Sequence, residues 1–214
     1  MIIHGSDPYR GPSVSLGNRL RRALWQLVYV LLFRPSPRPL HAWRSLLLRL
    51  FGARIGSGCH VYPSVRIWAP WNLVLSDHVG IADRTNLYTM ATISIGSHAV
   101  VSEGAFLCCG SHDYQSSNFQ LVAKPISVGA RAWICAEAFL HPGVDVPEGC
   151  VVGARAVVTK SLPEAWTVYA GNPCRVVGRR PPQPEKAPLA TATAGIRPIS
   201  RNPAPTSSPP WSSY

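Results

Sequence analysis

The stretch Ile-Gly-Ser-His-Ala-Val-Val-Ser-Glu-Gly-Ala-Phe-Leu at residues 95–107 carries an aliphatic side chain at every sixth position, namely Ile95, Val101 and Leu107. Alanine stands four positions after each of the first two. A period of six differs from the period of about 3.6 of an amphipathic helix and from the period of about two of a plain strand. It predicts a short strand followed by a corner, so that three such units close one triangular coil.

The same period runs through the middle of the chain as fifteen anchors, each an Ile, Leu or Val. The anchors fall into groups of three because their spacing widens to eight residues between Ile67 and Leu75 and between Leu87 and Ile95. The pattern predicts five triangular coils stacked into a prism whose interior the anchors fill. The anchors are Ile55, Val61, Ile67, Leu75, Ile81, Leu87, Ile95, Val101, Leu107, Val128, Ile134, Leu140, Val146, Val152 and Val158, and glycine follows four of them, at Gly56, Gly96, Gly129 and Gly153.

One break in the period is much longer than the others. Leu107 and Val128 are 21 residues apart where six are expected, so about 15 extra residues leave the prism there. We expect them to form one loop over residues 112–126. Loops displayed by a rigid scaffold are frequent carriers of binding and catalytic residues.

Residues 1–54 form a separate N-terminal arm with two expected amphipathic helices, at about 17–33 and 40–51. Two interpretations of their apolar stripes remain open. The stripes cover one end of the prism or pack between subunits, or residues 17–51 lie on an anionic lipid surface with a rim of Arg side chains. The stripe residues are Leu20, Ala23, Leu24, Leu27, Val28 and Leu31 in the first helix and Trp43, Leu46, Leu47, Leu50 and Phe51 in the second.

The composition separates the chain into an arm, a repetitive domain at 55–180 and a tail at 181–214. The tail is rich in Pro, Ser, Thr and Ala, a composition that predicts disorder. The 214 residues carry 21 Lys and Arg against 10 Asp and Glu, a net charge of +11. Most of this charge lies in the arm, which holds nine Arg and one acidic residue, while residues 55–163 are nearly neutral. The prism is therefore not expected to bind nucleic acid.

The six cysteines show no spacing typical of a zinc site or a disulfide framework. We expect them to be small buried side chains in a reducing compartment, and hence a cytoplasmic protein. The apolar run at 23–33 is shorter than the roughly 20 residues of a membrane-spanning helix. Peripheral contact with the inner face of the cytoplasmic membrane stays open.

Several motifs together resemble the hexapeptide-repeat acyltransferases, and within them the colanic-acid-type exopolysaccharide O-acetyltransferases. The resemblance covers roughly residues 15–180. It implies a left-handed parallel β-helix, a homotrimer, acetyl-CoA bound between neighbouring prisms, a saccharide acceptor in free or lipid-linked form, and no metal requirement. The motifs are Leu-Leu-Arg-Leu-Phe-Gly-Ala at 47–53, Ile-Gly-Ser-His-Ala-Val at 95–100, Gly-Ser-His-Asp-Tyr at 110–114, Val-Val-Gly-Ala-Arg-Ala-Val-Val-Thr-Lys at 151–160 and Ala-Gly-Asn-Pro-Cys-Arg-Val-Val at 170–177.

His112 stands where the repeat ends and the extra loop begins. Acetyl transfer to a hydroxyl needs a base for the hydroxyl proton, and an unperturbed imidazole, with a pKa of about 6.5, is available in its neutral form near pH 7. The resemblance implies that His112 is this catalytic base. Asp113 or Glu103 could orient its ring as the carboxylate does in a Ser-His-Asp triad.

The resemblance also implies binding residues. Asn86 and Tyr88 lie one coil before the loop, near the position where related enzymes contact the acceptor. For the cofactor, Lys and Arg suit the phosphates because they form charge-assisted hydrogen bonds. The implied coenzyme A contacts are Trp133 and Ala136 along the pantetheine arm, the backbone of Ala154, and Thr159, Lys160, Arg175 and Arg179 at the phosphates or adenine.

The sequence and the resemblance together predict an acetyl-CoA-dependent O-acetyltransferase that acts on an exopolysaccharide or its precursor. Three other functions remain as alternatives. The same scaffold can present an N-acetyltransferase of an amino sugar. A metal-dependent hydratase of the γ-carbonic-anhydrase kind needs three converging His, whereas no second His follows His112 within the loop. A non-catalytic trimeric scaffold is the third alternative.

Overall fold

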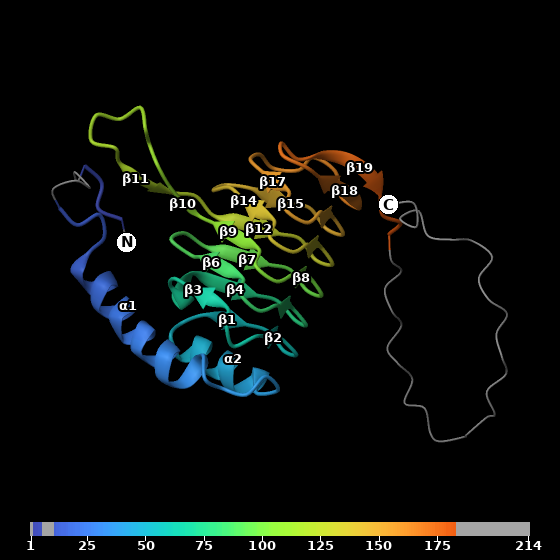
Figure 1. Cartoon of the computed structure of the whole chain (residues 1–214). Helices are drawn as coiled ribbons and strands as arrows, with labels where there is room; N and C mark the ends of the chain where they lie inside the picture. Colours follow the sequence, from blue (N-terminus) through green and yellow to red (C-terminus); the bar gives the residue numbers. More distant parts are fainter. Residues whose placement is uncertain (1, 6–10, 183–214) are drawn as a thin grey trace, which may run out of the picture. The chain divides into compact units, whose positions relative to one another are not determined.

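Three parallel sheets form the faces of a triangular β-helix, in which each coil contributes one short strand to each face (Figure 1). The computed structural model describes residues 2–5 and 11–182. The tail predicted to be disordered lies outside the described residues except for positions 181 and 182. The parallel β-helix implied by the resemblance is confirmed.

The strands of the first face are β1 (Arg54–Ile55), β4 (Leu73–Leu75), β7 (Ile93–Ile95), β12 (Ile126–Val128) and β15 (Asp145–Val146). Those of the second face are β2 (His60–Val61), β5 (Gly80–Ile81), β8 (Val100–Val101), β13 (Trp133–Ile134), β16 (Val151–Val152), β18 (Thr167–Ala170) and the antiparallel β19 (Arg175–Arg179). Those of the third face are β3 (Arg66–Ile67), β6 (Asn86–Tyr88), β9 (Phe106–Cys108), β14 (Phe139–Leu140) and β17 (Val157–Val158).

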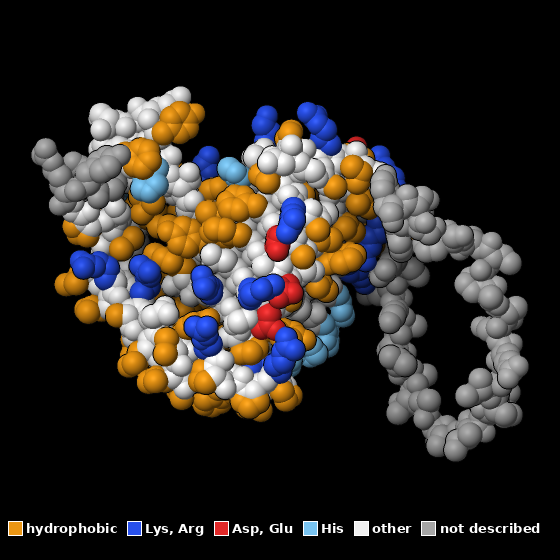
Figure 2. Space-filling model, in the orientation of Figure 1, with side chains coloured by type: hydrophobic (Ala, Val, Ile, Leu, Met, Phe, Trp, Pro, Cys, Tyr) orange, Lys and Arg blue, Asp and Glu red, His pale blue; other side chains and the backbone are white. Residues whose placement is uncertain are grey.

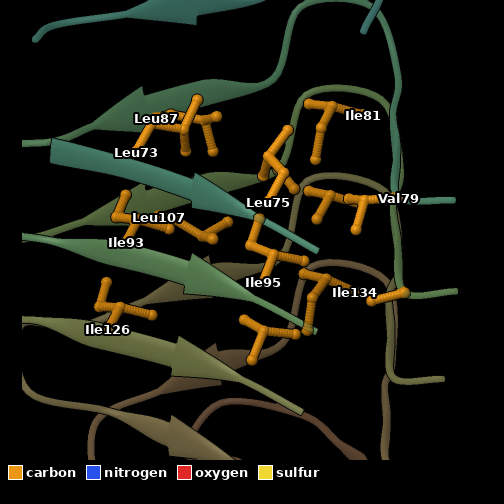
Figure 3. Packing of buried hydrophobic residues seen from close by; sticks show 14 of the residues in the cluster. Leu73, Leu75, Val79, Ile81, Leu87, Ile93, Ile95, Leu107, Ile126 and Ile134 are labelled. Carbon is orange, nitrogen blue, oxygen red and sulfur yellow. The ribbon is translucent and has the colours of Figure 1, made fainter. Parts of the chain in front are cut away.

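The anchors stack on one another along the axis of the prism, as Figure 3 shows for its central part. On the first face Leu75 pairs with Ile95, which pairs in turn with Val128. All fifteen anchors are buried, with at most 8% of their surface exposed. The predicted five coils are therefore present. The structure adds the beginning of a sixth, because β18 pairs in parallel with β16 and buries Tyr169 over the last coil.

The extra residues after β9 form a β-hairpin rather than an irregular loop. Strands β10 (Gly110–His112) and β11 (Leu121–Ala123) pair antiparallel, with His112 opposite Leu121. The excursion therefore begins two residues before the predicted limits of 112–126. In Figure 1 the hairpin projects away from the stacked coils.

The N-terminal arm contains the two expected helices. The first is α1 (Leu16–Val28), which continues directly as the π-helical segment η1 (Tyr29–Phe33), and the second is α2 (His41–Leu50). A short 3-10 helix, η2 (Pro70–Asn72), takes up the wider anchor spacing after Ile67. Among the described residues, no helix is long and apolar enough to cross a membrane.

The face that α1 and η1 turn toward the prism differs from the predicted stripe. Trp25, Tyr29 and Phe33 are buried, and the Trp25 Nε1–H donates a hydrogen bond to the Ile67 carbonyl at 2.8 Å. The stripe residues Leu20 and Leu24 are 63% and 56% exposed. The interpretation that this stripe covers the prism is therefore wrong for α1. Aromatic side chains occupy the inner face of α1 and η1 because they bury more apolar area than leucine does. The indole N–H also finds a carbonyl acceptor there.

The prediction of small buried cysteines is confirmed for Cys59, Cys109 and Cys150, whereas Cys108, Cys135 and Cys174 are partly exposed. Burial raises the pKa of Cys109 to about 12, and it also raises the pKa of the other five thiols. Because the thiolate is the reactive form, we expect all six to resist iodoacetamide at about pH 8 in the folded protein and to react fully in denaturant. Mass spectrometry counts the adducts. Rapid labelling of Cys109 in the native protein would contradict this expectation.

Candidate functional site

The hairpin fixes the imidazole of His112 through one hydrogen bond and one ring contact. The Nδ1 atom lies 2.9 Å from the carbonyl oxygen of Phe119. The two rings stack with centroids 4.4 Å apart and an angle of 11°. Because a carbonyl oxygen only accepts, Nδ1 carries the hydrogen in the neutral ring, and Nε2 keeps its lone pair. His112 is thereby prepared to accept a proton at Nε2.

Asp113 shapes the turn of the hairpin instead of touching the imidazole. Its carboxylate accepts from the backbone N–H of Gln115 at 3.0 Å, and its own N–H donates to the Gln120 carbonyl at 2.8 Å. The other candidate, Glu103, forms an ion pair with Arg84 at 2.6 Å. In this structure both carboxylates therefore have other partners, and the orientation of the ring by a carboxylate stays a prediction. The imidazole has the Phe119 carbonyl as its partner.

A hollow of about 410 Å³ surrounds the candidate base. Besides Ser111, His112 and Asp113 it is lined by Lys124 and His141, which the sequence did not single out as site residues. His141 follows β14, one coil beyond β9, at the corner from which the hairpin departs. Aligning the coils by their anchors would have placed it there. The hollow thus gathers two imidazoles and an ammonium group from the hairpin and the prism.

The two predicted acceptor residues lie together in a second hollow, of about 440 Å³, between the first helix and the third face. Asn86 and Tyr88 share this hollow with Arg34 and Arg66. Burial raises the pKa of the Tyr88 hydroxyl. No described carboxylate side chain lines the hollow.

A close backbone contact links the acceptor hollow to the hairpin. A Cβ atom on Gly110 would lie 2.7 Å from Cε1 of Tyr88 and 2.5 Å from the sulfur of Met90. A side chain at residue 110 would therefore require Met90 and the Tyr88 ring to shift. Gly110 is two residues before His112, so the hairpin strand that carries the candidate base starts beside Tyr88, while the base and the acceptor residues line separate hollows.

The predicted coenzyme A residues divide into two groups. Thr159, Lys160 and Arg175 line a third hollow, of about 580 Å³, at the end of the last coil. Arg179 lies outside this lining and forms an ion pair with Glu164.

The other predicted cofactor residues lie elsewhere on the prism. Trp133 is on the second face, 47% exposed, and its Nε1–H donates to the Ser102 hydroxyl at 2.8 Å. Ala136 and Ala154 occupy the corner between the second and third faces, where the Arg155 N–H donates to the Ala136 carbonyl. Thr159 and Lys160 follow β17 at the next corner. A single chain therefore does not bring the two groups together.

Within residues 2–5 and 11–182, no three His, Cys, Asp or Glu side chains converge in a way that could hold a metal ion.

Comparisons with known proteins agree with this fold. No family model matches the chain. It is 46% identical over 164 residues, 77% of this chain and 90% of the relative, to the "Putative colanic acid biosynthesis acetyltransferase WcaF" of Escherichia coli (strain K12). It is 28% identical over 155 residues to the galactoside O-acetyltransferase of the same strain, covering 66% of this chain and 70% of that enzyme.

A solved structure shares the architecture at lower identity. The hexapeptide-repeat containing acetyltransferase VCA0836 of Vibrio cholerae O1 biovar eltor, solved with acetyl coenzyme A, superposes with a TM-score of 0.70 at 22% identity, over 78% of this chain and 91% of that one. This likeness concerns the fold, while the 46% identity over most of both chains establishes the kinship. The chain belongs to the hexapeptide-repeat β-helix acetyltransferase family.

Proposed function

We propose that this acetyltransferase transfers the acetyl group of acetyl-CoA to a hydroxyl of an exopolysaccharide sugar or of its precursor, with His112 as general base. The observation that carries the proposal is the hydrogen bond between His112 Nδ1 and the Phe119 carbonyl, which leaves the Nε2 lone pair available. The names of two relatives, in colanic acid biosynthesis and galactoside O-acetylation, support a saccharide acceptor. The acetyl coenzyme A complex of VCA0836 supports the donor.

The proposed reaction is a direct transfer. The acceptor hydroxyl gives its proton to Nε2 of His112 while its oxygen attacks the thioester carbonyl carbon. The resulting tetrahedral intermediate collapses with cleavage of the C–S bond, and the imidazolium returns the proton to the departing sulfur. The products are an acetyl ester and free coenzyme A, so the imidazole ends the cycle neutral.

The acceptor hollow suits a saccharide that carries negative charge. Arg34 and Arg66 supply guanidinium groups, and Trp68 and Tyr88 supply aromatic rings on which a sugar can stack. Asn86 supplies an amide that can both donate and accept. In this proposal Asn86 and Tyr88 orient the acceptor toward the hairpin.

A homotrimer would complete the cofactor site. Trp133 lies on the second face, and Ala136 and Ala154 lie at the corner after it, whereas Thr159 and Lys160 lie at the next corner. The two groups therefore meet only if the corner of one subunit faces the next corner of its neighbour. Three prisms around one axis satisfy this requirement. Because Arg179 is paired with Glu164, we assign it a weaker part in binding phosphate than Lys160 and Arg175.

The acceptor chemistry is tested by analysis of the product. The purified full chain is incubated with acetyl-CoA and a panel of hexoses, nucleotide sugars and lipid-linked sugars, and acetylated products are identified by mass spectrometry. An alkali-labile product is an ester and supports the proposal. An alkali-stable amide would instead establish the N-acetyltransferase alternative, and failure to bind coenzyme A would favour a non-catalytic scaffold.

Loss of the cations at the end of the last coil should weaken cofactor binding. We expect Lys160→Ala and Arg175→Ala each to raise the Kd for coenzyme A roughly tenfold, because a hydrogen bond to a charged group contributes about 1.5–3 kcal/mol and tenfold corresponds to about 1.4 kcal/mol. Isothermal titration calorimetry measures the change. Arg54→Ala, at an exposed position of the first coil, is the matched control and should leave the Kd unchanged. If the double variant Lys160→Ala and Arg175→Ala has an unchanged Kd for coenzyme A, these two residues do not bind the cofactor.

A further inference from the structure

The N-terminal helices expose a broad apolar surface, which we call the leucine face. Its side chains are between 38% and 71% exposed, and Figure 2 shows them as a hydrophobic band along the lower left and the bottom of the molecule, where α1 and α2 lie in Figure 1. Monomeric proteins rarely expose so many large apolar side chains together without a partner for them. The leucine face consists of Leu16, Leu20, Leu24, Leu27, Val30, Leu31, Leu32, Leu40, Trp43, Leu46 and Leu50.

The contributions of the two helices join into one surface. The Nε1–H of Trp43 in α2 donates to the carbonyl of Leu32 in η1 at 3.1 Å. Along α1, Leu20, Leu24 and Leu27 recur at helical spacing and therefore share one side, and Leu31 follows four residues later in η1. Tryptophan is a residue type enriched at membrane–water interfaces.

The leucine face cannot turn inward, because the opposite side of α1 is already committed to the prism. Besides the buried Trp25, the guanidinium groups of Arg21 and Arg22 stack over Trp71 and Trp68 at 4.2 and 3.9 Å. On α2, the fully buried Arg44 donates to the Val61 carbonyl at 2.6 Å. A helix that is apolar on both sides needs a second partner on its outer side.

The charge around the leucine face indicates the nature of that partner. Residues 11–76 contain nine Arg and neither Asp nor Glu. In the described part of the chain, Arg19 in α1 and Arg34, directly after η1, have no carboxylate partner. A second copy of this face would oppose guanidinium to guanidinium. An anionic lipid surface would instead pair with these groups while accepting the leucines.

We propose that the leucine face docks the protein on an anionic lipid bilayer, with α1, η1 and α2 lying in the interface. Gln26, Val30 and Arg34 of this segment also line the hollow that contains Asn86 and Tyr88. Docking thus brings that hollow to the level of the lipid head groups. Given the proposed function, this location favours a lipid-linked saccharide as the acceptor.

Vesicle sedimentation with the full chain tests the docking directly. We expect the wild-type protein to bind vesicles of phosphatidylglycerol and phosphatidylcholine, and to bind pure phosphatidylcholine vesicles at least tenfold more weakly. Raising the salt concentration should release it from the anionic vesicles, because screening weakens the Arg contacts. Equal binding to both vesicle types, or no binding to either, would overturn the proposal.

Substitutions on the exposed leucines locate the surface. Leu24→Glu and Leu27→Glu combined should reduce vesicle binding at least tenfold without loss of the fold, which circular dichroism verifies, since both side chains are 56% exposed. Val177→Glu, at a 63% exposed position on β19, is the matched control and should bind like wild type. If the leucine variant instead changes the mass measured by light scattering, the face is a subunit contact and the proposal fails. Vesicle binding does not require acetyl transfer. Loss of vesicle binding therefore tests the membrane docking, and absence of acetyl transfer separately tests the proposed function.

Discussion

We expect His112→Ala to lower the rate of acetyl transfer by about 10²- to 10⁴-fold, the usual contribution of a positioned general base, while the protein keeps its fold and its affinity for acetyl-CoA. The expectation follows from the geometry of the hairpin, in which the Phe119 carbonyl fixes the Nδ1 hydrogen and leaves Nε2 as the proton acceptor. The measurement is kcat/KM for acetyl transfer, together with calorimetry for acetyl-CoA.

A second substitution separates the chemistry of the ring from its structural contact. His112→Asn retains a donor that can reach the Phe119 carbonyl, but it lacks a ring nitrogen that can take up a proton. We expect His112→Asn to be as inactive as His112→Ala and to unfold at the temperature of the wild type. Activity restored by Asn would mean that His112 only positions the hairpin.

The control for both variants is an exposed histidine far from the hairpin. His60 lies on β2 in the first coil, where its ring stacks on His41 with centroids 4.6 Å apart. His60→Ala should leave kcat/KM unchanged. Turnover of His112→Ala at the wild-type rate would show that His112 is not the general base.

We expect Gly129→Ala to destabilise the prism by about 1–3 kcal/mol, the range of overpacked positions. A Cβ atom at residue 129 would lie 2.4 Å from the backbone nitrogen of Glu148 and 2.6 Å from the carbonyl carbon of Pro147 in the next coil. Backbone cannot rotate away as a flexible side chain can, so the two coils must separate. Equilibrium denaturation followed by circular dichroism measures the loss.

The control for this substitution is another glycine of the prism. A Cβ atom at Gly80, in β5, would meet nothing within 4 Å, and neither glycine has a positive φ. The two substitutions therefore differ mainly in the space available to the new methyl group. We expect Gly80→Ala to be at least as stable as the wild type, because alanine has less backbone freedom to lose on folding. Equal destabilisation by both substitutions would show that coil spacing is not the cause.

The glycine that follows several anchors was visible in the sequence, and its reason is visible in the structure. Glycine follows Ile55, Ile95 and Val128, and a Cβ atom at each of these glycines would be within 2.8 Å of backbone in the next coil. The sequence shows the recurrence of glycine after these anchors. The stacking of successive corners supplies its physical reason.

The candidate site was predictable in part. The motif around His112 and the clustering of Lys160 with Arg175 follow from the sequence and its resemblance. The orientation of the imidazole does not, because a backbone carbonyl seven residues away provides it and every residue has such a carbonyl. His141 belongs to a regular repeat, so its residue type alone did not separate it from the other histidines of the prism, although aligning the coils by their anchors places it one coil beyond the hairpin.

The sequence by itself determined a prism of triangular coils, since a period of six with aliphatic anchors buries them when the coils stack, while the hand of the coil came from the family resemblance. It also determined that two apolar helices precede the prism. Only the tertiary structure decided which side of the first helix is buried, because Trp25 and Leu24 are adjacent in sequence and both apolar. The prism offers the Ile67 carbonyl to an indole N–H and offers nothing comparable to a leucine, so the tryptophan faces inward and the leucines face out.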